Sequence, residues 1–86
     1  MELAPDQMHD VLMRLKRAQG QLGGIIAMVE SGRDCADIVT QLAAVSKAIE
    51  RAGFLTIARG LRECMVDPEQ GQPDVDRLEK VFLSLA

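Results

Sequence analysis

Apolar residues recur along the chain at the spacing of one helical face. Between residues 11 and 29 they are separated by four, three, four, three and four positions, at Val11, Leu15, Ala18, Leu22, Ile25 and Val29. The same kind of spacing returns at Ile38, Leu42, Val45, Ile49 and Ala52, and again at Val75, Leu78, Phe82 and Leu85. No segment of useful length alternates with the period of two that marks a β-strand. The pattern predicts an all-α chain with three helices.

Turn-forming residues indicate where these helices begin and end. At residues 31–34 the sequence Ser-Gly-Arg-Asp interrupts a long proline-free stretch. Gly32 can take the left-handed position that ends a helix, and Asp34 can cap the next helix. The segment PEQGQP, residues 68–73, is typical of a loop. We therefore expect one domain, residues 1–86, with helices at about 6–31, 35–65 and 74–85.

The second helix is too long for the third to cover. Residues 35–65 span about 45 Å at 1.5 Å per residue, and a third helix of about 12 residues reaches less than half of that length. A chain of 86 residues is also marginally stable alone, because it buries only about 60–65% of its unfolded surface. We therefore expect oligomerisation, for which a two-fold symmetric dimer is the commonest solution.

The two cysteines, Cys35 and Cys64, lie in the first and last turns of the second predicted helix. Their separation of 29 residues corresponds to about 43 Å along a continuous helix, whereas a disulfide needs Cα atoms within about 7 Å. Two antiparallel copies of this helix would place Cys35 of one chain near Cys64 of the other. The helix dipole favours the thiolate at Cys35, the predicted nucleophile. Two buried, inert cysteines are an equally good interpretation of the spacing alone.

The net charge of −3 conceals an uneven distribution. Residues 11–62 carry eight basic and four acidic residues, a net charge of +4, while both ends of the chain are acidic. Five of the basic residues cluster on the first two helices: Arg14, Lys16, Arg17, Lys47 and Arg51. Such a cluster is more often a solvated face, although it can also neutralise DNA phosphates.

Few residues are suited to catalysis or to membrane insertion. The chain has one His and lacks a Gly-rich phosphate loop, a CxxC or HExxH motif and a plausible Ser/His/Asp set, so we expect neither enzymatic activity nor a cofactor. Its acidic N-terminus lacks the apolar core of a signal peptide. The longest uncharged run has 12 residues, against about 20 for a membrane span. We expect a cytoplasmic protein that does not associate with membranes.

Three motifs within residues 9–66 are more specific: an R-L-K-R-x-x-G-Q opening, a C-x-D-I-x-T-Q-x-x-A-V run and a second Cys 29 residues after the first. Together they resemble the copper-sensing operon repressor (CsoR) family. The resemblance implies an all-helical repressor that assembles as a disc-shaped tetramer, a dimer of dimers, and leaves its operator DNA when an inducer alters the cysteine site. It also implies DNA contacts by Arg14 and Arg51, with Lys16 and Arg17 beside them.

The residue four positions before the second Cys separates branches of this family. Metal-sensing members have His there in a Cys-His-Cys set, whereas this chain has Gly60. The two-Cys pattern without His resembles the persulfide-sensing CsoR-like sulfurtransferase repressors (CstR). We therefore expect a persulfide or polysulfide donor to link Cys35 and Cys64 of neighbouring chains and release DNA. The alternatives are Cu(I) bound by the same two thiolates, or a helical sulfur-carrier or interaction module that does not bind DNA.

Overall fold

The computed structural model describes residues 2–66 and 68–85, apart from the side chains of residues 64, 66 and 68–72. A short 3-10 turn, η1 (Pro5–Met8), leads into three helices, α1 (His9–Glu30), α2 (Cys35–Val66) and α3 (Pro68–Leu85). No strand occurs among the described residues. The prediction of an all-helical protomer with two long helices and a third is confirmed.

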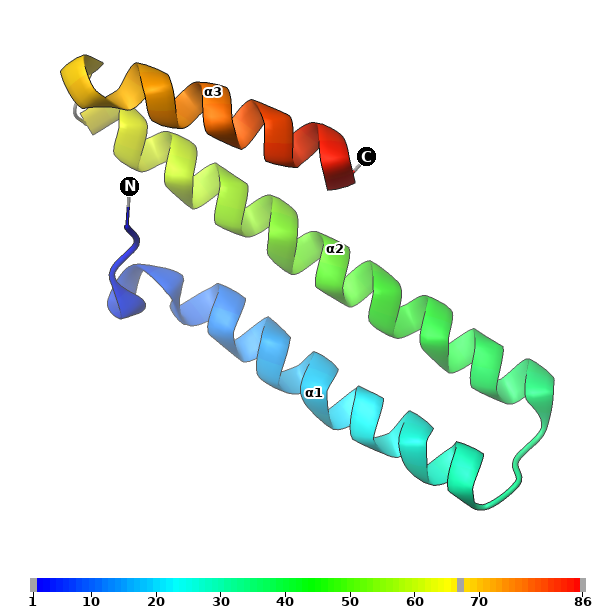
Figure 1. The fold of residues 1–86 in the computed structure, drawn as a ribbon. Helices are drawn as coiled ribbons and strands as arrows, with labels where there is room; N and C mark the ends of the chain where they lie inside the picture. Colours follow the sequence, from blue (N-terminus) through cyan, green and yellow to red (C-terminus); the bar gives the residue numbers. More distant parts are fainter. Residues whose placement is uncertain (1, 67, 86) are drawn as a thin grey trace.

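The helices form a single layer (Figure 1). α1 and α2 make an antiparallel hairpin, and α3 folds back along the C-terminal half of α2 on the side away from α1. α1 and α3 do not contact each other within the described residues. The Cα atoms accordingly extend over 55 × 26 × 13 Å. The N-terminal half of α2 is therefore covered on one side only, by α1.

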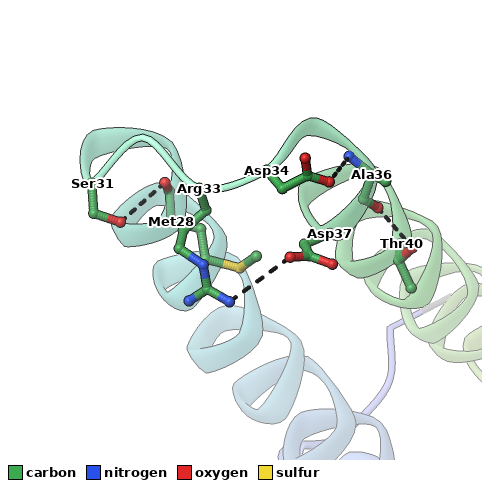
Figure 2. Close-up of polar contacts among 7 residues, drawn as sticks. All are labelled: Met28, Ser31, Arg33, Asp34, Ala36, Asp37 and Thr40. Atoms are coloured by element: carbon green, nitrogen blue, oxygen red, sulfur yellow. Dashed lines mark hydrogen bonds and ion pairs between the residues drawn. The ribbon is translucent and has the colours of Figure 1, made fainter.

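The turn between α1 and α2 is built as its sequence predicts. Gly32 has φ 73°, and the N–H groups of Gly32 and Arg33 donate to the carbonyls of Val29 and Met28 at 3.2 and 3.0 Å, which is a Schellman cap. Asp34 Oδ2 then accepts a hydrogen bond from the Ala36 N–H at 3.0 Å and caps α2. Figure 2 shows these side chains together with an ion pair between Arg33 and Asp37. The turn fixes where α1 ends and α2 begins, and so sets the register of the hairpin.

The buried core of the protomer is small. Only six of the described side chains are buried hydrophobic residues: Val11, Ala18, Ile25, Val45, Ala52 and Ile57. Many larger apolar residues, including Leu22, Leu42 and Ile49, are close to half exposed. None of the helices in the described part of the chain has both the length and the apolar character needed to cross a bilayer.

The predicted loop at residues 68–73 is wrong, because α3 begins at Pro68 and continues through Pro73. Proline is favourable at the first helical position, since that residue's N–H would be unpaired in any helix and the ring fixes φ near the helical value. Pro73 lies further inside and costs one backbone hydrogen bond without ending the helix. The N-terminal boundary also differs, because the first predicted turn is a 3-10 turn and α1 begins at His9.

Candidate functional site

Four of the five predicted DNA-binding residues line one groove between α1 and α2. Its volume is about 310 Å³, and its lining consists of Arg14, Arg17, Gln21, Ala44, Lys47, Ala48 and Arg51. We call it the basic groove. It has four cations and no acidic residue in its lining. Lys16, the fifth predicted residue, is exposed on α1 and does not line this groove.

The antiparallel register of the hairpin explains this convergence. Residues equally distant from the turn lie at the same level, which places Arg14 beside Arg51 and Arg17 beside Ala48. Arg14 and Arg51 also border a second, shallower hollow together with Phe54 and Leu55. Two short sequence clusters, far apart along the chain, therefore form one positively charged strip.

The groove cations are not neutralised within the protomer. The ion pairs found in residues 2–66 are Arg33–Asp37, at 4.0 Å, and Asp10–Arg59, at 2.5 Å, and neither involves a groove residue. Unpaired guanidinium and ammonium groups that share a concave surface reinforce one another's field and attract anions. The groove is therefore suited to a polyanion such as DNA.

The opposite face of the hairpin is apolar and includes Cys35. Helical geometry, at about 100° per residue, puts the groove residues on one flank of the buried Ala18 and Val45. The other flank, about 40–80° from these buried residues, is formed by six residues that we call the cysteine face: Leu15, Leu22 and Ile26 of α1 and Cys35, Leu42 and Ile49 of α2. All six are exposed in the protomer. The hairpin thus has a charged side and an apolar side.

Cys35 is a free, exposed cysteine at the first position of α2. The side chain of Cys64 lies outside the described residues, but its backbone belongs to the same unbroken helix. The predicted separation of about 43 Å therefore applies, and the two thiols of one chain cannot meet. Among the described residues, no group of three or more His, Cys, Asp or Glu side chains is placed to hold a metal ion. A site that uses both cysteines must combine two protomers.

The N-terminal segment is tied to the end of α2 that carries Cys64. The Gln7 Nε2 amide donates to Glu63 Oε1 at 3.0 Å, and Asp10 pairs with Arg59, whose side chain is 24% exposed. The sequence analysis missed these contacts, because nothing in the spacing of Gln7 or Asp10 indicates a partner some 50 residues away. Gly60, where metal-sensing relatives carry His, is buried in this turn of α2.

Comparison with known proteins identifies the family. Residues 7–84 match the model of the metal-sensitive transcriptional repressors. The chain belongs to this family. It is 40% identical over 76 residues, 85% of this chain, to the copper-sensing transcriptional repressor CsoR of Mycobacterium ulcerans (strain Agy99). It is also 35% identical over 72 residues, 80% of this chain and 71% of the relative, to CsoR of Bacillus subtilis (strain 168). The family is one of repressors rather than enzymes, in agreement with the prediction.

A solved structure supports the same family assignment. The copper-sensing repressor CsoR with Cu(I) from Geobacillus thermodenitrificans NG80-2 superposes with a TM-score of 0.82 at 26% identity, covering 98% of this chain and 91% of that chain. The chain spans less than two thirds of the mycobacterial CsoR proteins that it matches: 65% of the M. ulcerans protein and 44% of the protein from Mycobacterium tuberculosis (strain ATCC 25618 / H37Rv).

Proposed function

We propose that this protein is a cytoplasmic, operator-binding transcriptional repressor that acts as an oligomer. The basic groove contacts DNA phosphates, and the inducer acts where Cys35 of one protomer meets Cys64 of the partner subunit. The observation that carries the DNA-binding half is the convergence of four unpaired cations, Arg14, Arg17, Lys47 and Arg51, on a surface free of acidic residues.

Two features of the protomer support a two-fold dimer through the cysteine face. Its exposed apolar residues, such as Leu22, Leu42 and Ile49, are costly to leave in water and would be buried against a second copy. Residue 49 also lies at the middle of the stretch between the two cysteines. A two-fold axis passing beside Ile49 would bring Cys35 close to Cys64 of the partner subunit at each end of the pair. A disc-shaped dimer of dimers, as the family resemblance implies, would be built from this dimer.

Cu(I) is the inducer that the relatives favour. The mycobacterial and Bacillus relatives are named copper-sensing, and the Geobacillus structure contains Cu(I). Thiolates select Cu(I), and two of them can hold the ion in linear coordination. Cys35 and Cys64 of the partner subunit would be the ligands. Binding would then pull two protomers into an arrangement with lower affinity for DNA.

A reactive sulfur species is a second candidate inducer, which the absence of a histidine at position 60 favours. With Gly60 in that position, the candidate site has two thiols and no imidazole. The Cys35 thiolate would attack a polysulfide, release hydrosulfide and become a persulfide. Cys64 of the partner subunit would then attack the chain and expel a second hydrosulfide, leaving a di-, tri- or tetrasulfide cross-link. The two thiols are oxidised and the polysulfide is reduced.

One anaerobic titration distinguishes the possibilities. Reduced protein is bound to fluorescent DNA from the region upstream of its own gene, and either Cu(I) or sodium tetrasulfide is added. Loss of DNA binding with stoichiometric Cu(I), and no covalent dimer by intact mass spectrometry, supports copper sensing. Loss of binding with tetrasulfide, together with a dimer heavier than two chains by a few sulfur atoms, supports sulfur sensing.

Variants of each thiol provide the controls. Cys35→Ala and Cys64→Ala should bind DNA like the unaltered protein and remain bound when the inducer is added. A mixture of the two variants can form one complete intersubunit site in a dimer and should regain part of the response. Release of DNA from Cys35→Ala would exclude this cysteine as the sensor. A protein with no salt-dependent DNA affinity would instead be a helical carrier or interaction module.

A further inference from the structure

Gln21 differs from the other polar residues of the basic groove. It is the groove's uncharged hydrogen-bonding side chain, and it lies one turn beyond Arg17 on the same flank of α1. Equal distance from the turn places it opposite Ala44, whose side chain is too short to reach across and bond to it. Gln21 is exposed, and its amide makes no hydrogen bond within the described residues. The groove therefore ends in a free amide beside a small residue.

The surface of α1 around Gln21 is nearly bare of side chains. Gly20, Gly23 and Gly24 surround it, and a Cβ added at any of the three would meet nothing within 4 Å. Packing inside the protomer therefore does not require these glycines, although each costs roughly 1 kcal/mol relative to Ala in a helix. Their effect is to let a large partner approach the backbone of α1 closely while Gln21 projects toward it.

We propose that Gln21 is the residue through which the basic groove reads DNA sequence, whereas Arg14, Arg17, Lys47 and Arg51 contact phosphates. This inference rests on the proposed function. A Gln amide can both donate and accept, which matches N7 and N6 of adenine in the major groove. Cations at phosphates fix position without carrying sequence information. From Arg14 to Gln21 the helix rises about 10 Å, the length of about three base-pair steps.

The test is selection from a library of random duplexes. Unaltered protein and Gln21→Ala are each put through the selection, and the best duplex is then titrated with every position substituted in turn. The unaltered protein should prefer A·T at one position of each half-site by about 5- to 150-fold, the discrimination expected of a bidentate contact. Gln21→Ala should lose that preference and keep its affinity for random-sequence DNA.

Two matched variants complete the test. Gln19→Ala removes an exposed amide from the same helix but on the other flank, and it should keep every base preference. Arg14→Ala should weaken binding to selected and random duplexes alike. The inference is overturned if Gln21→Ala retains the full pattern of preferences, or if it weakens all duplexes equally. If the unaltered protein enriches no sequence and binds no DNA, the proposed function itself fails, which is a distinct outcome.

Discussion

The salt dependence of DNA binding tests the basic groove directly. Each protomer offers four groove cations, so two protomers on one site offer eight. Each phosphate contact contributes about −0.9 to the slope of log affinity against log salt, which gives about −7 for eight contacts. Between 50 and 200 mM salt, a protein with 6–10 such contacts loses about 10³- to 10⁵-fold in affinity.

Removing single cations should change this slope by a countable amount. Arg14→Ala takes one contact from each of two protomers and should make the slope shallower by about 2. Arg14→Ala combined with Arg51→Ala should make it shallower by about 4. The assay is fluorescence anisotropy on one duplex at five salt concentrations. Lys16→Ala is the matched control, because it removes a cation of α1 that does not line the groove. An equal change of slope for Lys16→Ala and Arg14→Ala would refute the reasoning.

Three further predictions concern the sensor and the fold. Gly60→His restores an imidazole four residues before Cys64 and should tighten Cu(I) binding about tenfold or more, the scale that even second-shell partners contribute; a chelator competition that shows no change from Gly60→Ala contradicts this. Ile25→Ala should cost about 2–5 kcal/mol and Ile25→Val about 0.5–1.5 kcal/mol, because Ile25 is only 4% exposed; denaturation at fixed protein concentration measures both, and equal losses would count against the packing argument. Asp34→Ala should cost about 0.5–2 kcal/mol through loss of the α2 cap, while Asp34→Asn should stay close to the unaltered protein; thermal melts compare the two.

The hairpin could be predicted from the sequence because its signals are local. Heptad-like spacing fixes the buried faces of α1 and α2, and Gly32 and Asp34 have the conformations that their residue types favour. The start of α3 at Pro68 could not, because proline is found both in loops and in the first turn of helices. Composition alone does not distinguish these two cases.

The site was predictable only in part, for a similar reason. Arg14 and Arg51 meet because the hairpin is antiparallel, and that follows from the short turn. Gln21 could have been found from its spacing of seven from Arg14 and four from Arg17, which places all three on one flank of α1. The Asp10–Arg59 pair depends on how the helix ends pack together, and no local pattern encodes it.

The thinness of the hairpin has a mechanical consequence. Cys35 and Arg51 are carried by the same helix and point about 160° apart around its axis. A rotation of α2 by about 20° moves a side-chain tip at a radius of about 6 Å through about 2 Å. Such a rotation displaces Cys35 and Arg51 together, in opposite directions, with no intervening layer of residues to absorb the motion. In this protein one rigid helix is enough to couple the two faces.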